Sequence, residues 1–316
     1  MKTYSLLIAV LFLGGTLLSA CQPASTVTQD MPVPENTATP TESPVLTENP
    51  EPWQMIGEYT VKFQTILVGF DNASYGITIG EHGEVHYTSD AGANWPRSEN
   101  SSAALYGLDI LDAQTAWICG SLSTRVTING GQTWQPVSDF GGGVPSHCRF
   151  ISFADKQAGW AGTTAKLGTT VDGAATWNEA TLPEGLDLIA AISQFAPGQG
   201  YLLDVTGKLY FTTDNAESWT SAGELPLENI KIDSKNYPVT AMRFSDTMQG
   251  MVVITAVVDG QAQVTAFRTR DGGQTWTKEI VPAGYGIPYI SRDGKTLTLF
   301  SPPYKAVVLQ YHGQED

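Results

Sequence analysis

An eight-residue pattern, Ser/Thr-x-Asp-x-Gly-x-Thr/Ser-Trp, recurs five times in this chain and constrains its fold more than any other feature. Its copies, some with one or two departures, are Thr88–Trp95, Thr127–Trp134, Thr170–Trp177, Thr212–Trp219 and Thr269–Trp276. The tryptophans that end successive copies are 39, 43, 42 and 57 residues apart. A period of roughly forty residues, with short strands between turn signals, is typical of four-stranded antiparallel blades. The repeat therefore predicts an all-β fold, a single β-propeller.

The third and last positions of each copy hold the residues that we expect to build a hairpin turn. They are Asp90 and Trp95, Asn129 and Trp134, Asp172 and Trp177, Asp214 and Trp219, and Asp271 and Trp276. A short carboxylate can accept N–H bonds within its own turn, glycine adopts a positive φ without steric cost, and tryptophan packs a large ring beneath the turn. The predicted role is structural. Where Ala174 and Ala216 replace the glycine and Asn94 replaces the second hydroxyl, we expect looser turns.

A second, weaker repeat precedes the turn motifs. Asp112 stands five residues before Trp117, and Asp155 stands five residues before Trp160. The same slots recur at Asp246 to Met251 and Ala196 to Tyr201, with a one-residue variant at Asp71 to Tyr75. These segments predict the turn between the first and second strands of a blade. Every blade then has two hairpins, and the eight-residue motif lies between its third and fourth strands.

The chain divides into five blades that carry the motif and a remainder that completes a sixth. The five blades begin near Thr65, Leu105, Cys148, Leu188 and Val239. Residues 286–312 contain three strand-like runs without a motif tryptophan, and Gly57–Phe63 is one unpaired run before the first blade. Three C-terminal strands joined by this N-terminal strand would close the ring and remove two exposed edges. Six blades are favoured, with seven as the alternative, because Ser291–Gly294 resembles a degenerate motif.

The N-terminus has the features of a lipoprotein signal. Residues 1–20 combine Lys2, an apolar run and small residues before a cysteine, and the run is too short for a spanning helix. Leu18-Ser19-Ala20 before Cys21 fits a lipobox. Resemblance to bacterial lipoproteins implies cleavage before Cys21 and lipid attachment there. We expect an extracytoplasmic protein that this lipid anchors to the bacterial cell membrane or outer membrane.

Residues 21–52 form a predicted tether, and residues 53–316 form the predicted propeller. From Gln22 to Pro52 the chain holds seven prolines, eight Ser or Thr, five acidic residues and no Lys or Arg. Such a composition cannot bury enough apolar surface to offset the entropy of ordering, so we expect the tether to be disordered. The formal net charge of the whole chain is −15. So acidic a chain repels nucleic acid, and we predict no nucleic-acid partner.

Two cysteines remain after Cys21, namely Cys119 and Cys148. In an oxidising compartment a disulfide is the default expectation, and it would join neighbouring blades; two buried free thiols are the alternative. No metal site is assigned, because His147 beside Cys148 lacks further ligands and His82 and His86 straddle a predicted hairpin. No cofactor is predicted.

The repeated motif resembles the Asp box of the sialidase-like repeat proteins, and we use that name below. The sialidase site uses three arginines, a Tyr/Glu pair and an acidic Asp. The arginines of this chain are Arg97, Arg125, Arg149, Arg243, Arg268, Arg270 and Arg292. Only Arg149 and Arg243 are expected on innermost strands, Arg270 lies inside a box, and no Arg-Ile-Pro segment occurs near the start. The sialidase site therefore cannot be carried over, and we assign no catalytic residue.

The Gly-Trp-Ala segment at Gly159–Ala161, together with the Asp boxes, resembles the photosystem II stability/assembly factor family over most of residues 57–280. The resemblance implies a non-catalytic propeller that binds proteins, in that family a photosystem subunit precursor. Family members carry seven blades and an arginine-rich patch, which has no evident counterpart here, so the scaffold role is carried over and the photosystem partner is not. We expect a membrane-anchored binding or assembly module for a protein or a glycan. The alternative is a glycoside hydrolase or glycan-binding protein of the sialidase-like superfamily.

Overall fold

The computed structural model describes residues 52–61, 64–100, 103–122, 124–137, 147–232, 239–283, 286–302 and 304–313. Its contacts divide the chain into two units, Met1–Glu48 and Asn49–Asp316, and the description concerns the second. The predicted signal peptide, Cys21 and all of the predicted tether except Pro52 lie outside the described residues. Among the residues described, none forms a helix with the length and apolar character needed to cross a bilayer.

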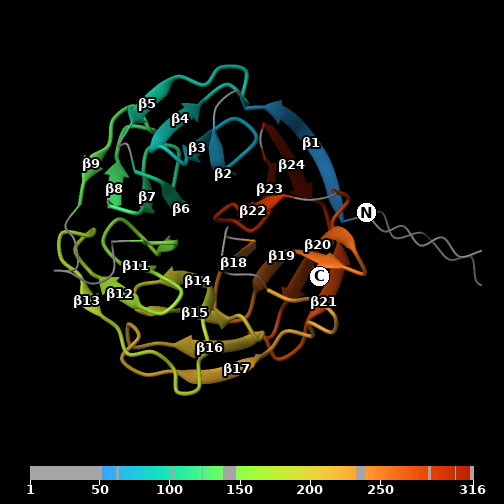
Figure 1. Ribbon diagram of the computed structural model, residues 1–316. Helices are drawn as coiled ribbons and strands as arrows, with labels where there is room; N and C mark the ends of the chain where they lie inside the picture. Colours follow the sequence, from blue (N-terminus) through green and yellow to red (C-terminus); the bar gives the residue numbers. More distant parts are fainter. Residues whose placement is uncertain are drawn as a thin grey trace, which may run out of the picture. The chain divides into compact units, whose positions relative to one another are not determined.

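Six four-stranded antiparallel sheets stand around a central axis as the blades of a propeller, as Figure 1 shows. Blade 1 consists of β2 (Thr65–Phe70), β3 (Gly76–Gly80), β4 (Glu84–Thr88) and β5 (Arg97–Asn100). Blade 2 consists of β6 (Leu105–Ile110), β7 (Ala116–Gly120), β8 (Thr124–Thr127) and β9 (Gln135–Pro136). Blade 3 consists of β10 (Phe150–Phe153), β11 (Gly159–Gly162), β12 (Leu167–Thr170) and β13 (Asn178–Glu179).

The next two blades have the same order of strands from the axis outward. Blade 4 consists of β14 (Ile189–Ala196), β15 (Gln199–Asp204), β16 (Lys208–Thr212) and β17 (Thr220–Glu224). Blade 5 consists of β18 (Thr240–Phe244), β19 (Gly250–Val258), β20 (Gln261–Thr269) and β21 (Thr277–Ile280). In blades 1 to 5 the Asp-box turn joins the third strand to the fourth, as predicted. The Asp boxes and the turns between first and second strands share one face of the ring, which we call the box face.

Blade 6 closes the ring with strands from both ends of the chain. Its inner three strands are β22 (Ile287–Ile290), β23 (Thr296–Ser301) and β24 (Lys305–Tyr311), and its outermost strand is β1 (Trp53–Thr60). β1 pairs antiparallel with β24, so that Trp53 lies opposite Tyr311. The predicted six blades and the predicted closure are confirmed, and the seven-blade alternative is wrong.

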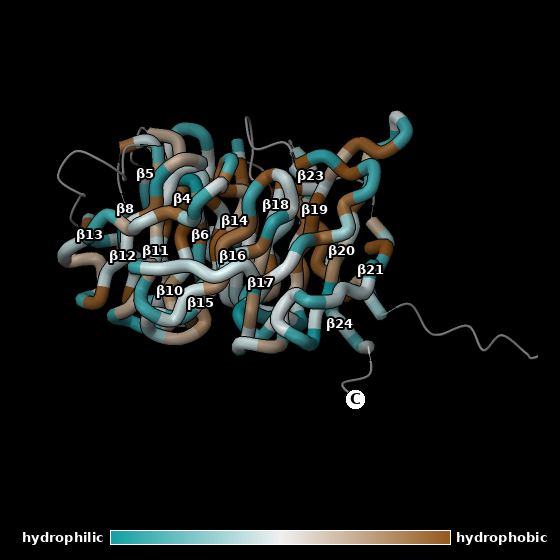
Figure 2. Tube along the Cα trace, turned by 90° about the horizontal axis from the view of Figure 1, so that it is seen from below, coloured by the Kyte–Doolittle hydropathy of each residue, from teal (hydrophilic) through white to brown (hydrophobic). Residues whose placement is uncertain are grey.

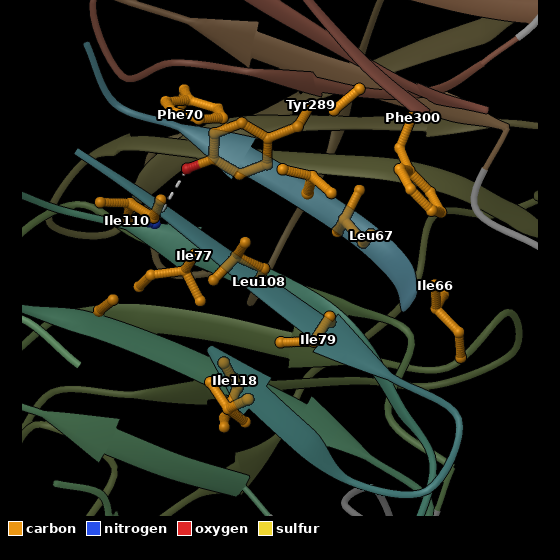
Figure 3. Packing of buried hydrophobic residues seen from close by; sticks show 14 of the residues in the cluster. Ile66, Leu67, Phe70, Ile77, Ile79, Leu108, Ile110, Ile118, Tyr289 and Phe300 are labelled. Atoms are coloured by element: carbon orange, nitrogen blue, oxygen red, sulfur yellow. Dashed lines mark hydrogen bonds between the residues drawn. The ribbon is translucent and has the colours of Figure 1, made fainter. Parts of the chain in front are cut away.

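The core lies between neighbouring blades, where large side chains of one blade pack on the next. The ring of Phe153 stacks on Trp117 of blade 2 with centroids 3.7 Å apart, and Phe244 stacks on Tyr201 of blade 4 at 3.8 Å. Figure 3 shows the corresponding packing of aliphatic side chains around Tyr289, where blades 6, 1 and 2 meet. In Figure 2 the hydrophobic segments lie mainly within the thickness of the ring. Burial of these stacked rings holds the blades together.

Glycines at the start of the second strands make room for these rings. A Cβ atom on Gly159 would lie 2.4 Å from the ring of Phe153, and one on Gly250 would lie 2.4 Å from the ring of Phe244. Blade 2 has the smaller Ile110 in place of the phenylalanine, and there Ala116 occupies the glycine position. In blades 1, 3 and 5 the glycine therefore follows from the close approach of a phenylalanine ring of the same blade, whereas blade 4 pairs Gly200 with Gln194.

Candidate functional site

The Asp-box turns are held by the same set of bonds in all five blades. The threonine that opens each box donates its hydroxyl to the Asp or Asn two residues later, at 2.7–3.0 Å. That side chain in turn accepts the backbone N–H four residues further on, at 2.8–3.0 Å. Trp134, which ends the second box, is buried at 7% exposure. These bonds stay within each turn, so the geometry of the boxes is that of a folding element.

The departures from the motif keep these bonds. Ala174 and Ala216 stand where the motif has glycine, with φ of 75° and 65°, and their N–H groups still donate to the threonine of their box. In the second box, Asn129 Oδ1 accepts the backbone N–H of Thr133, and Asn129 Nδ2 donates to the Thr133 hydroxyl at 2.8 Å. The cost of the two alanines is therefore their left-handed backbone conformation.

The box carboxylates are strongly acidic. Side-chain and backbone hydrogen bonds from Ser218 lower the pKa of Asp214 to about 2, and bonds from Thr275 lower the pKa of Asp271 to about 2. The pKa values of Asp172 and Asp90 are lowered by the same kinds of hydrogen bond. A carboxylic acid that acts as a general acid needs a raised pKa. The lowered pKa values of the box carboxylates therefore do not suit them to that role.

Near the box face, polar residues close to the ends of three inner strands form a series of bonds between blades. Asp109, Ser152 and Ser193 occupy equivalent positions on β6, β10 and β14. Each accepts a backbone N–H from the following blade, from Phe153, Gln194 and Phe244 respectively, at 2.7, 3.0 and 2.9 Å. Because an inner strand has no further strand toward the axis, its N–H groups need such partners.

Tyr289 of blade 6 continues this series across blade 1. Its hydroxyl accepts the N–H of Ile110 at 3.0 Å, on blade 2. Blade 1 has Gly69 at the equivalent position, where a Cβ atom would lie 2.9 Å from the ring of Tyr289. Burial and the nearby Asp109 raise the pKa of Tyr289, so this phenol stays protonated. The glycine thus lets one side chain bridge two blades that are not neighbours.

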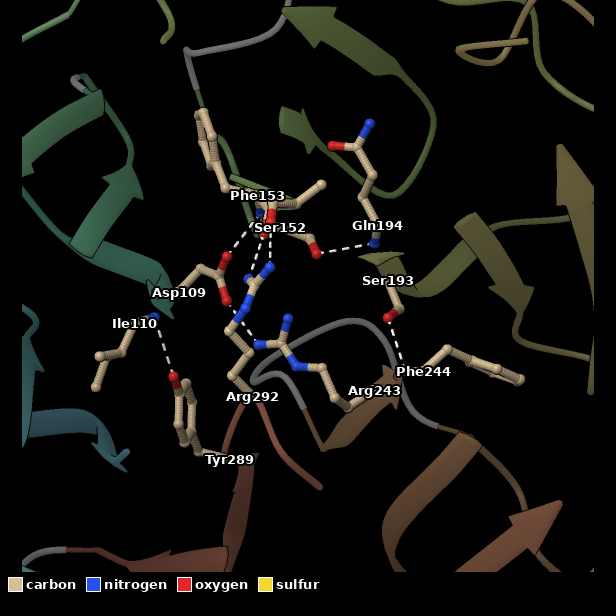
Figure 4. Close-up of polar contacts among 11 residues, drawn as sticks. Asp109, Ile110, Ser152, Phe153, Ser193, Gln194, Arg243, Phe244, Tyr289 and Arg292 are labelled. Atoms are coloured by element: carbon tan, nitrogen blue, oxygen red, sulfur yellow. Dashed lines mark hydrogen bonds and ion pairs between the residues drawn. The ribbon is translucent and has the colours of Figure 1, made fainter. Parts of the chain in front are cut away.

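Two arginines cross the axis to the opposite side of the ring, as Figure 4 shows. Arg243 of blade 5 donates to Asp109 of blade 2 at 2.6 Å, and both side chains are buried. Arg292, which follows β22 in blade 6, donates to the carbonyl oxygens of Phe153 and Ala154 in blade 3. Burial lowers the pKa of Arg243, but Asp109 more than offsets this and the net shift is upward. The side chains of these two arginines fill the centre of the ring near the box face.

Two cavities meet at Arg243. One, of about 80 Å³, enters the ring from the face opposite the boxes, past Tyr106, Arg149 and Thr240. The other, of about 480 Å³, opens on the box face between blades 5 and 6. The turn after β18, the box of blade 5 and the turn after β22 line this second cavity, which we call the blade 5–6 pocket.

The blade 5–6 pocket is rich in positive charge. Its lining contains the four cations Arg243, Arg268, Arg270 and Lys295, against the single acid Asp293. At its outer end the guanidinium carbon of Arg268 lies 3.6 Å from the ring centroid of Tyr311, in cation–π geometry. Two of the four cations have carboxylate partners behind the lining: Asp109 lies 2.6 Å from Arg243, and Glu279 lies 3.5 Å from Arg268. The pocket thus keeps a small excess of positive charge in a chain with a net charge of −15.

The sequence alone predicts no arginine patch, because the four cations lie in three segments of the chain that only the fold brings together. These segments are β18, the end of β20 with the box that follows it, and the turn after β22. Arg149 precedes β10 instead of lying on it, whereas Arg243 lies on the innermost strand β18 as expected. Arg125, on the third strand of blade 2, forms an ion pair with Glu99 of blade 1 at 2.7 Å. One available signal was overlooked: the position of Asp109, Ser152 and Ser193 is polar in otherwise apolar strands.

The remaining candidate residues take structural places. Cys119 and Cys148 form a disulfide between β7 and the segment leading into β10. His86 Nδ1 lies 3.2 Å from the carbonyl oxygen of Trp95, and His82 lies beside Glu84. In the part of the chain that the structure describes, no group of three or more His, Cys, Asp or Glu is placed to hold a metal ion. Cys21 lies outside that part.

Comparison with known proteins finds no matching protein-family model. In sequence, the chain is 24% identical over 178 residues to the photosystem II assembly lipoprotein Ycf48 of Synechococcus sp. (strain CC9902). This match covers 55% of the chain and 48% of that protein, so the chain spans about half the length of the curated relative.

Solved structures share the fold at low identity. A structure of YCF48 bound to a D1 peptide matches with a TM-score of 0.53 and 14% identity, over 84% of this chain and 98% of that one. YCF48 from Cyanidioschyzon merolae matches with a TM-score of 0.52 and 15% identity, over 82% and 98%. An ancestral GH74 enzyme matches with a TM-score of 0.52 and 13% identity, over 83% of this chain but 36% of the enzyme. The resemblance predicted from the repeats is thus confirmed: the chain is similar in sequence to a photosystem II assembly lipoprotein and in fold to YCF48.

Proposed function

We propose that this chain is a non-catalytic scaffold that binds a protein partner through the blade 5–6 pocket, outside the cytoplasm and anchored by a lipid on Cys21. The similarity to an assembly lipoprotein favours a scaffold over an enzyme. That a similar fold has been solved with a bound peptide favours a protein as the ligand.

The observation that carries the proposal is the concentration of cations in one pocket of an acidic protein. Arg270 and Lys295 line a cavity of about 480 Å³ together with the acid Asp293. The other two cations of the lining are paired, Arg243 with Asp109 and Arg268 with Glu279, so a small excess of positive charge remains. Positive charge at one place attracts an anionic partner there, and the acidic surface elsewhere repels it. The expected partner therefore presents acidic groups.

Charge reversal tests this assignment. The lipidated full chain, isolated from its host with its partners, should lose them when Arg270→Glu and Lys295→Glu are combined. Lys208→Glu is the matched control, because Lys208 is an exposed cation at the start of β16, on the face opposite the boxes. Partners that are retained by the double variant, or lost equally with the control, would contradict the assignment.

Lipid anchoring has a separate test. Cys21→Ser removes the thiol to which the lipid would be attached, so this variant should leave the membrane fraction and appear in the soluble extracytoplasmic fraction. Metabolic labelling with a clickable palmitate analogue should mark the wild-type chain and leave the variant unmarked. A Cys21→Ser chain that stays in the membrane fraction would refute the anchor while leaving the scaffold role open.

The hydrolase alternative makes a different demand on the site. Most glycoside hydrolases use two carboxylates on either side of the scissile bond. Among the described residues, Asp293 is the one carboxylate that lines either of the two cavities that meet at Arg243. We therefore favour the scaffold. Turnover of a fluorogenic glycoside by the purified chain, abolished by Asp293→Asn, would overturn it.

A further inference from the structure

We propose that Asn129 is a site of spontaneous deamidation, which is prevented while the second Asp box is folded and proceeds when its turn opens. The reaction converts the asparagine into the aspartate that the other four boxes carry, so the folded ring accepts this product. The modification is independent of the partner proposed above. It concerns the one Asp box whose third residue is an amide.

The second Asp box contains the only Asn-Gly pair of the chain, Asn129-Gly130. An asparagine deamidates when the backbone nitrogen of the next residue attacks its side-chain carbonyl carbon. Glycine has no Cβ atom to hinder that approach, so an Asn-Gly pair is the least hindered context for this reaction. The boxes of blades 3 and 5 have Asp172-Gly173 and Asp271-Gly272 at the same place, where no amide can be lost.

Deamidation of Asn129 exchanges an amide for a carboxylate in two steps. The Gly130 nitrogen gives up its proton and forms a bond to Cγ of Asn129, while the Cγ–Nδ2 bond breaks and ammonia leaves with that proton. Water then opens the cyclic imide. Addition of water at Cγ breaks the new bond and gives aspartate, whereas addition at the backbone carbonyl carbon of Asn129 breaks its bond to Gly130 and gives isoaspartate. Water is the only co-reactant.

The folded box engages both reacting groups in other bonds. Asn129 Oδ1 accepts the Thr127 hydroxyl and the N–H of Thr133, both at 3.0 Å, and Nδ2 donates to the Thr133 hydroxyl at 2.8 Å. The N–H of Gly130 donates to the carbonyl oxygen of Gln114 at 2.9 Å, and Gly130 is buried. Cyclisation breaks these bonds, so it requires local opening of the turn.

The aspartate product fits the box, because the other boxes are built on it. In the boxes of blades 3, 4 and 5 a hydroxyl four residues after the aspartate donates to its second oxygen, at 2.6, 2.5 and 2.6 Å. In the second box this bond runs the other way, from Asn129 Nδ2 to Thr133. Deamidation lets the Thr133 hydroxyl rotate and donate to a charged acceptor, which makes a stronger bond. Isoaspartate adds a backbone carbon within the turn, so it cannot reproduce the spacing of these bonds.

Incubation of the full chain at neutral pH, in buffer and in urea, tests the proposal. Peptide mass spectrometry with chromatography separates asparagine from its two products, with Asn129→Asp as the standard for one of them. Asn178 is the internal reference, because it is exposed but is followed by Glu179. The matched variant is Asp271→Asn, which places an Asn-Gly pair in the same turn of blade 5. There the N–H of Gly272 is also bonded, to the carbonyl oxygen of Met248 at 2.9 Å.

We expect both Asn-Gly pairs to deamidate in urea, and at least about tenfold more slowly in the folded chain, with no change at Asn178. Urea below the unfolding transition should raise the rate at Asn129, because it increases the fraction of open turns. After dilution from urea, the refolded fraction should be enriched in aspartate and the fraction that fails to refold in isoaspartate. The denaturation midpoint of Asn129→Asp should equal or exceed that of wild type.

Three results would overturn the inference. Equal rates in the folded and the unfolded chain would mean that the bonds of the box give no protection. Fast reaction at Asn129 and slow reaction in Asp271→Asn, both folded, would mean that the shared turn is not what protects. Isoaspartate in the refolded fraction at the same proportion as in urea, or an Asn129→Asp variant less stable than wild type, would mean that the box does not select the aspartate product.

Discussion

Asp109 on β6 and Arg243 on β18 form an ion pair of 2.6 Å that spans the axis of the propeller, between blades that lie opposite each other in the ring. Asp109 also accepts the N–H of Phe153 on the neighbouring blade 3. One carboxylate therefore ties three blades together, and its two oxygens have different partners. The pair also forms the inner end of the blade 5–6 pocket, where Arg243 contributes to the lining.

Removal of Arg243 alone should destabilise the ring strongly. Arg243→Met leaves the buried carboxylate of Asp109 without its counter-charge, and the loss of one partner of a buried pair costs about 3–5 kcal/mol. Chemical denaturation followed by tryptophan fluorescence measures this loss. The control is Arg125→Met, which breaks the ion pair with Glu99 near the surface and should cost no more than about 1 kcal/mol.

A double variant distinguishes charge burial from packing. Serine occupies the position of Asp109 in blades 3 and 4, where Ser152 and Ser193 accept the N–H of the next blade. Asp109→Ser combined with Arg243→Met should therefore regain most of the stability that Arg243→Met loses. A double variant no more stable than Arg243→Met would show that lost packing, and not the unpaired charge, causes the destabilisation.

Gly159 should tolerate a methyl group only if Phe153 becomes smaller. Gly159→Ala places a Cβ atom against the ring of Phe153, and overpacking of a core typically costs about 1–3 kcal/mol. Phe153→Ile combined with Gly159→Ala reproduces Ile110 and Ala116 of blade 2. This double variant should lose less stability than the sum of the losses of the two single variants. Thermal unfolding of the single and double variants measures this coupling, and strict additivity would contradict the steric explanation.

Acid should weaken the propeller through its Asp boxes. The pKa of Asp214 and of Asp271 is lowered to about 2 by their hydrogen bonds, below the value of about 3.9 for an unfolded chain. Their ionised forms therefore stabilise the fold above the unfolded pKa, and this contribution is lost as the pH falls from about 4 through about 2.

Asparagine in the boxes should flatten this acid dependence. Asn129 already holds one box with an amide in place of the carboxylate, so Asp214→Asn combined with Asp271→Asn is expected to fold. The difference in stability between pH 5 and pH 2.5 should be smaller for this variant than for wild type. Glu184→Gln, which changes an exposed carboxylate outside any box, is the control and should leave the difference unchanged.

The fold was predictable because the repeat encodes it locally. Each Asp box carries its own turn bonds, and Gly159 and Gly250 mark the start of second strands because a ring of the same blade lies against them. The blade number and the closure by an N-terminal strand follow from counting these signals. The bounds of that strand do not, because Gly57–Phe63 was predicted and β1 is Trp53–Thr60. The candidate site was not predictable in this way, because Arg243, Arg270 and Lys295 are far apart in sequence and meet only when blades 5 and 6 pack side by side.

The disulfide between Cys119 and Cys148 should stabilise the seam of blades 2 and 3 and resist reduction in the folded protein. Its loop of 29 residues predicts a contribution of about 3–4 kcal/mol from restriction of the unfolded chain. Both cysteines are fully buried, so a thiol reductant reaches them only after opening of the structure. Cys119→Ser combined with Cys148→Ser should lower the free energy of unfolding by that amount, and labelling of native wild type with a thiol reagent after mild reduction should be slow. Rapid labelling, or equal stability of the double variant, would contradict a structural disulfide at this seam.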